Sequence, residues 1–274
     1  MRKKIEGFFQ SPIQKVQRFC MWIGASVLLM AALGVLLTVL FFRSLPDVQS
    51  AQYSDLQHRA ELRVQAKMDK RRPLQWVAID RMNRELLYSI VMSEDSTFFE
   101  HEGVNFDAMI SAMLQNLRTK KYEVGASTLS QQVAKNLYLT SDKSLLRKLK
   151  EVIITRRLEA RLSKNEILEL YMNLAEFGPD LFGIDAASSH YFKKKPSDIN
   201  AAEGAFLALM LPSPRKFHFS IFENQNITLS KKKKIRRILG DMLSQELISP
   251  KQYREYIRYD YFSDDERSPA SRRR

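Results

Sequence analysis

One apolar run near the N-terminus constrains this chain more than any other feature. From Phe19 to Phe42, 24 consecutive residues carry no charge, and an arginine flanks each end. As an α-helix the run is about 36 Å long, which exceeds the ~30 Å hydrocarbon core of a bilayer. A cleaved signal peptide has a shorter apolar region and then a small-x-small cleavage site, which Ser44–Asp47 does not provide. The run therefore predicts a transmembrane anchor at 19–42.

Charges on either side of the run predict its orientation. Residues 1–18 hold five basic side chains and one acidic side chain, whereas Arg43 is soon offset by Asp47. By the positive-inside rule, residues 1–18 are the cytoplasmic N-terminus and the rest of the chain lies outside. The single cysteine, Cys20, falls within the run. The exported part therefore has no thiol, which suits an oxidising compartment.

Composition excludes several classes of protein. The 9 glycines form neither the G-x-G-x-x-G nor the G-x-x-x-x-G-K-[ST] pattern, so a Rossmann unit or a P-loop is not expected. One cysteine and four histidines leave no disulfide framework and no C-x-x-C or H-E-x-x-H metal site. The net charge of +13 suits anionic lipid headgroups or a phosphorylated lipid better than nucleic acid, because the globular part is exported. Few glycines and long periodic stretches predict a mainly helical, all-α fold.

The rest of the chain divides into three parts. We expect a polar stalk at 43–73, a globular domain at 74–225 and a basic helical C-terminal extension at 226–274. A β-like run at 75–79 opens the domain. The basic run at 231–237 is typical of a solvated helix face or a membrane-surface patch. Residues suited to begin helices are Asn83, Ser127, Ser144, Ser163, Asn200 and Ser249.

An acidic and aromatic segment is the first candidate for chemistry. Glu94 and Asp95 come shortly before Phe98 and His101. Glu94, Phe98 and His101 share a face if the preceding helix continues. A carboxylate beside aromatic rings and a second acid is typical of a proton-transfer group. An ordinary solvated helix end is the alternative, and the residues alone leave it open.

A second segment is suited to binding sugar or phosphate. From Gly125 to Gln132, a glycine and small hydroxyl residues at a helix start offer N–H and O–H groups to an anion. Gln131 and Gln132 are adjacent amides that can hydrogen-bond sugar groups, and Lys135 lies one turn beyond Gln131. An ordinary helix cap is the alternative.

A third segment combines basic residues with one carboxylate. Arg147 and Glu151 are spaced i,i+4, which on most helices makes a surface ion pair. The functional interpretation needs Arg147, Lys148 and Lys150 to bind phosphate while Glu151 orients them or holds a cation.

In this order, the segments resemble the peptidoglycan glycosyltransferases (glycosyltransferase family 51), above all their monofunctional, membrane-anchored members. The resemblance covers about residues 75–217 and includes E-D-x-x-F-x-x-H-x-G, G-[GA]-S-T-[IL]-[TS]-Q-Q and R-K-x-x-E. Five motifs at family-like spacing are far more specific than any one of them. The matched segments are Glu94–Gly103, Gly125–Gln132, Arg147–Glu151, Lys164–Asn173 and Ala208–Pro214.

The resemblance implies a lysozyme-like domain that acts on lipid II at the outer leaflet of a bacterial inner membrane, with the catalytic domain in the periplasm. Glu94 would be the general base for an inverting β-1,4 transfer that releases undecaprenyl pyrophosphate. Glu151 would be the second catalytic carboxylate, with room for a divalent cation (Mg²⁺ or Mn²⁺). The substrate-binding residues it implies are Asp95, Phe98, His101, Ser127, Thr128, Gln131, Gln132, Lys135, Arg147, Lys148 and Lys150.

The resemblance also implies partners and leaves other functions open. Expected partners are lipid II, the growing glycan strand, membrane lipids and other cell-wall synthesis proteins, without nucleic acid or an organic cofactor. A glycan-cleaving lytic transglycosylase or muramidase is one alternative, although the second and third motifs suit a pyrophosphate better than a polymer. A catalytically idle, membrane-tethered cell-wall assembly factor is the other, although Glu94 is present.

Two departures and one apolar stripe add further expectations. Lys143 stands where the family often has arginine, and Lys193 stands where it usually has glycine, which puts that turn in doubt. The stripe on residues 106–113 suits a membrane-dipping element and ordinary core packing about equally.

Overall fold

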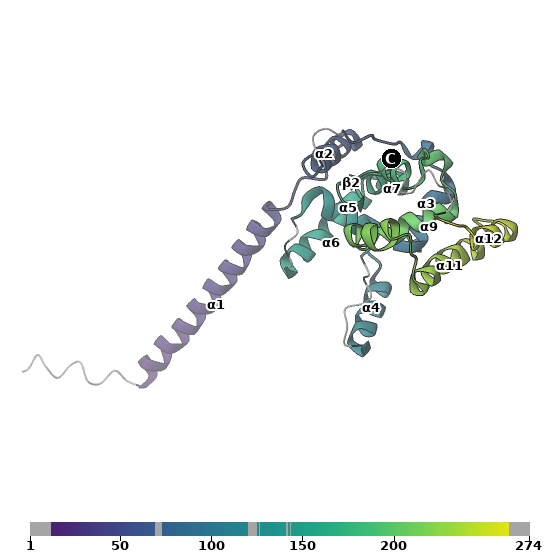
Figure 1. Cartoon of the computed structure of the whole chain (residues 1–274). Coiled ribbons are helices and arrows are strands. Elements are labelled where there is room, and N and C mark those ends of the chain that lie inside the picture. The colour runs from purple at the N-terminus through teal and green to yellow at the C-terminus, as the bar shows by residue number, and fades with distance from the viewer. Residues whose placement is uncertain are drawn as a thin grey trace, which may run out of the picture. The chain divides into compact units, whose positions relative to one another are not determined.

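The computed structural model describes residues 12–68, 73–119, 125, 127–140, 142 and 144–262 (Figure 1). Lys143, one of the two expected departures, lies outside these residues. The chain forms two compact units, Met1–Pro46 and Asp47–Arg274.

The first unit holds one long helix, α1 (Pro12–Arg43). Within it, Gln14–Arg43 is 30 residues long, includes an 18-residue stretch with a mean hydropathy of 2.6, and exposes its apolar side chains. The hydroxyls of Ser26 and Thr38 each donate to the carbonyl four residues earlier, at 2.8 Å, which satisfies them within the helix. The helix contains the predicted anchor at 19–42 and is compatible with a single membrane crossing.

The second unit is mainly helical, which confirms the predicted fold class. Its only described strands, β1 (Glu176–Gly178) and β2 (Leu181–Phe182), form a small antiparallel pair. Its helices are α2 (Tyr53–Gln65), η1 (Ile79–Arg81), α3 (Arg84–Glu94), α4 (Phe106–Thr119), α5 (Leu129–Tyr138), α6 (Leu145–Glu159), α7 (Lys164–Leu174), α8 (Ile184–Phe192), η2 (Pro196–Asp198), α9 (Ala201–Met210), α10 (Pro214–Phe217), η3 (His218–Glu223), α11 (Leu229–Ser244) and α12 (Pro250–Tyr256).

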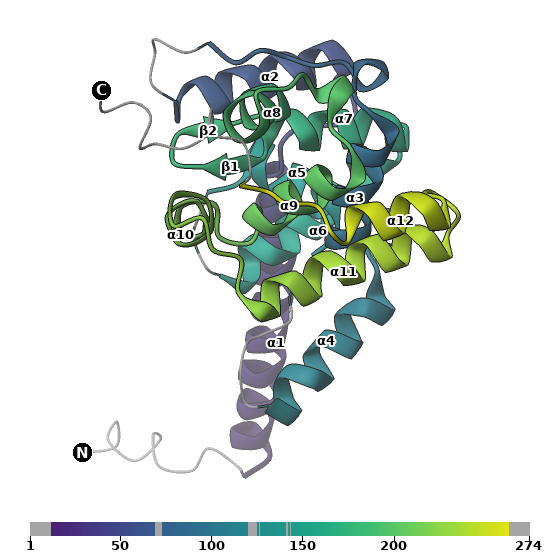
Figure 2. The ribbon, with the colours of Figure 1, turned by 45° about the vertical axis from the view of Figure 1, so that its right-hand side comes forward.

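Two helices form the centre of this unit. Every residue of α9 is buried, and the helix packs against α3 on one side and α11 on another (Figure 2). From Ile167 to Leu174 all residues of α7 except Glu169 are buried, and α7 packs against α2 and α5. The ends of α3, α5 and α6, where the candidate residues lie, are therefore supported by a common core.

Local capping signals placed most helix starts correctly. Asn83, Ser144, Ser163, Asn200 and Ser249 each accept a hydrogen bond from the first turn of their helix. The prediction for α5 was wrong by one residue: Thr128, not Ser127, is the cap. Thr128 forms a reciprocal capping box with Gln131, whereas Ser127 remains outside the helix.

The β-like run at 75–79 does not form a strand. Instead, the side-chain amide of Asn173 makes the two hydrogen bonds that the backbone of a partner strand would make. It accepts from Val77 N–H at 2.9 Å and donates to Val77 C=O at 2.9 Å. Ile79 then begins η1, and its N–H donates to Glu169. Because buried side chains satisfy this backbone, no partner strand is needed.

The expected stalk and C-terminal extension do not separate from the domain as compact units. Leu56, Ala60 and Val64 of α2 are fully or almost fully buried in the same core. The later segment is fixed by two carboxylates: the half-buried Glu85 accepts from Gln252 and Tyr256, and the fully buried Glu203 accepts from Tyr259. These contacts join residues more than 50 positions apart, which helix periodicity does not reveal.

The turn expected to be in doubt does form, with lysine in an unfavourable conformation. Lys193 ends α8 with φ of 56° and ψ of 30°, the left-handed region in which a Cβ atom is crowded. Its N–H still donates to Ser189 C=O at 3.1 Å. Lysine therefore closes this helix at a cost that glycine would avoid.

Candidate active site

A cavity of about 340 Å³ lies beside Glu94. Its lining comes from the end of α3 and residues 95–97, from α4, from Gly125, Ser127 and Thr128, and from α11. Segments from the first and second motifs thus meet around one space. A carboxylate faces small hydroxyl residues there, as a sugar site requires.

Glu94 is the last residue of α3 and is half-buried. One of its carboxylate oxygens accepts from Gln132 Nε2 at 3.2 Å, and the other lies 3.4 Å from Ser93 Oγ. Both contacts are at the long end of hydrogen-bond distances, so the carboxylate is oriented without being fully occupied. It remains able to accept a proton from a bound hydroxyl.

The predicted face shared by Glu94, Phe98 and His101 does not form, because the helix ends at Glu94. Asp95 has φ of −163° and turns the chain away. Phe98 is then fully buried, and its ring lies 4.6 Å below the Lys164 ammonium. Lys164 also donates to His101 C=O at 2.6 Å, which fixes the loop after α3 against α7.

The buried Asp95 and the largely buried His101 form a pair. His101 Nε2 lies 3.0 Å from both oxygens of Asp95, and Leu129 N–H donates to the same carboxylate at 2.9 Å. His101 Nδ1 accepts from Gly103 N–H at 3.0 Å, so these hydrogen bonds place the imidazole proton on Nε2. Asp95 therefore connects the end of α3 to the start of α5 and fixes Glu94 relative to the second motif.

The residues of the second motif are of two kinds: some are buried and stabilise the fold, and others place polar groups next to the residues of the first and third motifs. Thr128 donates to Gly103 C=O at 2.6 Å, and Gln131 uses its amide oxygen in the capping box. Both are almost fully buried. Gln131 Nε2 is buried without a partner among the described residues. Ser127 and Gln132, by contrast, present their polar groups to Lys148 and Glu94 respectively.

The third motif forms a compact charge cluster around Glu151. This carboxylate is 2% exposed, and its two oxygens bind different cations: Arg147 Nη1 at 2.8 Å and Lys148 Nζ at 2.5 Å. Lys148 also donates to Ser127 at 3.1 Å, which joins the cluster to the rim of the Glu94 cavity. Two cations on one carboxylate leave an excess positive charge, as an anion-binding site requires.

Lys135 adds a further cation to this cluster. Desolvation of its amine lowers the pKa of Lys135, an effect that the negative charge of Glu151 opposes and that Arg147 and Lys148 reinforce. The remaining predicted cation, Lys150, is partly buried on α6 but makes no hydrogen bond or ion pair with the described residues. The structure thus gathers Lys135, Arg147 and Lys148 but not Lys150.

Sequence reasoning missed the contribution of α11. Arg237 and Asp241 line the Glu94 cavity. Desolvation lowers the pKa of Lys234, and the charge of Glu94 opposes this shift. Lys234 and Arg237 belong to the basic run at 231–237 that we expected to be a solvated face or a membrane patch. About 140 residues separate Lys234 from Glu94, so no local pattern could have paired them.

The described residues offer no ready set of ligands for the expected divalent cation. Among them, no three His, Cys, Asp or Glu side chains are grouped so as to hold a metal ion. Glu151 offers one carboxylate, and Arg147 and Lys148 already occupy both of its oxygens. This donor set does not fit a resident cation, which would need several free oxygen ligands.

Comparison with known proteins gives a consistent result. A family model described as Transglycosylase matches residues 61–243. Similar proteins named biosynthetic peptidoglycan transglycosylase include one from Nitrosospira multiformis, 42% identical over 172 residues (63% of this chain and 73% of the relative). Another from Pasteurella multocida is 38% identical over 210 residues (77% and 83%), and one from a Janthinobacterium species is 45% identical over 140 residues (51% and 61%).

Proposed function

The chain belongs to the transglycosylase family, and from that premise we propose that it is a peptidoglycan glycosyltransferase that polymerises glycan strands from lipid II. The observation that carries the proposal is that a candidate base and a cluster of cations lie next to each other. A half-buried, incompletely occupied carboxylate, Glu94, lies at a cavity whose rim is joined to a cation cluster on Glu151. An inverting sugar transfer needs a base at one place and charge stabilisation of the leaving group at another.

Glu94 acts as the general base in this proposal. The 4-hydroxyl of the acceptor's N-acetylglucosamine loses its proton to the Glu94 carboxylate while its oxygen forms a bond to the donor's anomeric carbon. The bond from that carbon to the pyrophosphate oxygen breaks, and its electron pair leaves with undecaprenyl pyrophosphate. Attack from the face opposite the leaving group gives a β-1,4 linkage. Gln132 orients Glu94 through the 3.2 Å contact.

Lys135, Arg147 and Lys148 neutralise the pyrophosphate that leaves. A phosphate leaving group needs no general acid if positive charge stabilises it. Glu151 holds the guanidinium of Arg147 and the ammonium of Lys148 at fixed positions on α6. The proposal assigns this neutralisation to the basic side chains, since the described carboxylates do not form a cation site.

Other motif residues position the reacting ones. Asp95 and Thr128 are buried and His101 is largely buried, and their hydrogen bonds join the loop after α3 to the start of α5. Phe98 anchors the same loop in the core. They keep Glu94 near Ser127 and Gln132, and we assign them a positioning role rather than direct contact with the sugar.

We assign the location from the charges that flank α1. The N-terminus lies in the cytoplasm, α1 crosses a bacterial inner membrane, and the second unit works in the periplasm. Lipid II presented at the outer leaflet then lies on the same side as Glu94. The expected protein partners in cell-wall synthesis are part of the same proposal and rest on membership of the transglycosylase family.

The test is a direct assay of substrate and product. Detergent-solubilised protein is incubated with lipid II, and separately with preformed glycan, and the products are separated by size. Long glycan from lipid II is the expected result, with preformed glycan left intact. Shortening of preformed glycan without polymerisation would instead assign the protein to the lytic transglycosylases or muramidases. No reaction with either substrate would favour an idle assembly factor.

A further inference from the structure

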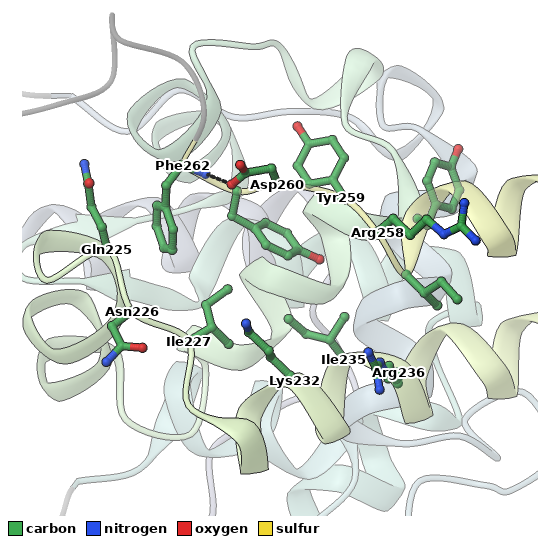
Figure 3. Close-up of a pocket in the computed structure, with 13 residues that line it drawn as sticks. Gln225, Asn226, Ile227, Lys232, Ile235, Arg236, Arg258, Tyr259, Asp260 and Phe262 are labelled. Carbon is green, nitrogen blue, oxygen red and sulfur yellow. Dashed lines mark hydrogen bonds between the residues drawn. The ribbon is translucent and has the colours of Figure 1, made fainter.

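A second cavity, of about 310 Å³, lies between α11 and the segment after α12 (Figure 3), and it shares no lining residue with the Glu94 cavity. Residues 225–227 and α11 form one side, and residues 256–262, from the last residue of α12 onward, form the other. Lys234 and Arg237 are directed to the Glu94 side, whereas Lys232 and Arg236 line this second cavity. The basic run on α11 therefore contributes side chains to two separate cavities.

The chemistry of this cavity combines an apolar floor with a cationic rim. Ile227 and Ile235 are buried beneath it, 7% and 4% exposed. Lys232 and Arg236 rise from α11, and Arg258 comes from the other side (Figure 3). Asp260 is the only acidic residue among its described lining residues. Three cations against one acid favour an anionic ligand.

These cations have no acidic partners in the described part of the chain. Lys232, Arg236 and Arg258 form no ion pair there, in contrast to Arg147 and Lys148 in the catalytic cluster. Like charges around one cavity repel each other, and a bound carboxylate would relieve that repulsion. Each would then gain a charge-assisted hydrogen bond.

The aromatic wall of the cavity is held rigid by the core. The hydroxyls of Tyr256, Tyr259 and Tyr261 donate to Glu85 Oε2 (2.8 Å), Glu203 Oε1 (2.6 Å) and Ala202 C=O (3.2 Å). Their rings are thereby fixed before any ligand binds, which reduces the entropic cost of association. Tyrosine and arginine around a small apolar pocket are the residues most enriched where proteins bind one another.

We propose that this cavity binds a short acidic peptide segment of a partner protein, with an apolar side chain on the isoleucine floor and flanking carboxylates on Lys232, Arg236 and Arg258. A peptide fits better than a lipid headgroup because the floor and the fixed aromatic wall suit a side chain beside a carboxylate. The proposal concerns a cavity that shares no lining residue with the Glu94 cavity. It therefore does not rest on the assignment of Glu94 as base.

The test uses two fluorescein-labelled pools of eight-residue peptides. One pool places Asp or Glu on both sides of a central Leu or Phe, and the other places Asn or Gln there. Binding to the detergent-solubilised full chain is followed by fluorescence anisotropy. The pocket variant combines Lys232→Ala and Arg236→Ala, and the matched control combines Lys233→Ala and Arg254→Ala, which removes two exposed charges outside the cavity.

We expect the acidic pool to bind the wild type and the control alike, and the pocket variant about 10-fold or more weakly. The neutral pool should bind weakly to all three, and lipid II polymerisation should be equal in all three. Equal binding of both pools, or equal losses in the two variants, would overturn the proposal. So would cavity-dependent binding of phosphatidylglycerol vesicles without binding of acidic peptides.

One further variant tests whether the chain supplies its own acidic segment. Asp264, Asp265 and Glu266 follow shortly after the cavity in sequence. If the acidic pool binds only after these three residues are changed to Ser, the occupant is this chain's own segment, and the assignment to a partner is overturned. Unchanged binding supports the partner.

Discussion

Some residues of the candidate site expose polar groups to a cavity or to the charge cluster, and others are bonded within the protein. Both kinds occur in the same motifs, so a motif position alone does not tell them apart. Glu94, Gln132, Lys135, Arg147 and Lys148 offer polar groups at a cavity or in the charge cluster. The other members bond or pack within the protein itself: Asp95, Phe98, Thr128 and Gln131, which are buried, and His101, which is largely buried. Substitutions in the first group should change the chemistry, and those in the second should first change the position of Glu94.

Replacing Lys135 with Arg should move the alkaline limit of activity. Desolvation lowers the pKa of Lys135, so this lysine loses its positive charge at a lower pH than an exposed lysine does. Arginine stays charged throughout. In Lys135→Arg, kcat/KM for lipid II should therefore persist to higher pH than in the wild type. A Lys251→Arg control on the exposed surface of α12 should keep the wild-type profile, and coincident profiles for Lys135→Arg and the wild type would contradict the role of Lys135.

At the scale of elements, local signals predicted more than distant ones. Helix starts at Ser163 and Asn200 were readable because each cap bonds only to its own first turn. The run at 75–79 was misread because its partner is the Asn173 side chain, almost 100 residues away. The motif residues around Glu94 were found by resemblance. Lys234 was missed because its approach to Glu94 depends on how α11 packs against α3.

Replacing Lys193 with Gly should stabilise the second unit. Lys193 adopts the left-handed conformation at the end of α8, which costs a residue with a Cβ atom about 1 kcal/mol. Glycine removes that strain but has more freedom when unfolded, so the net gain should be roughly 0.5–1 kcal/mol. Denaturant unfolding of the full chain measures it. Lys195→Gly, at an ordinary φ of −77°, should not stabilise, and equal effects at both positions would refute the explanation.

At the scale of the whole molecule, the apolar stripe on α4 is exposed. Phe106, Ile110 and Met113 are 56%, 55% and 61% accessible, and α4 also contributes to the lining of the Glu94 cavity. Ordinary core packing, one of the two expectations for this stripe, is therefore wrong for these side chains. An exposed apolar face next to a site for a lipid-linked substrate supports contact with the bilayer.

A chain that begins at Asp47 tests this membrane contact without α1. Because residues from Asp47 onward form a compact unit, the truncated protein should unfold at the same temperature as the full chain. It should still bind phosphatidylglycerol vesicles in a flotation assay, and Ile110→Asp with Met113→Asp should abolish most of that binding. Asp substitutions at the exposed Leu62 of α2 and Leu229 of α11 serve as the control. Loss of binding in this control as well would show that the effect is not specific to α4.

The central claim is that Glu94 is the base of a glycan polymerase, and the rate of lipid II polymerisation by Glu94→Gln tests it most directly. Glutamine keeps the shape and the contact with Gln132 but cannot accept the proton of the acceptor hydroxyl. The account predicts a rate at least about 100-fold below that of the wild type, with an unchanged unfolding temperature. A Glu94→Gln protein that is folded and still polymerises lipid II at the wild-type rate would contradict the account.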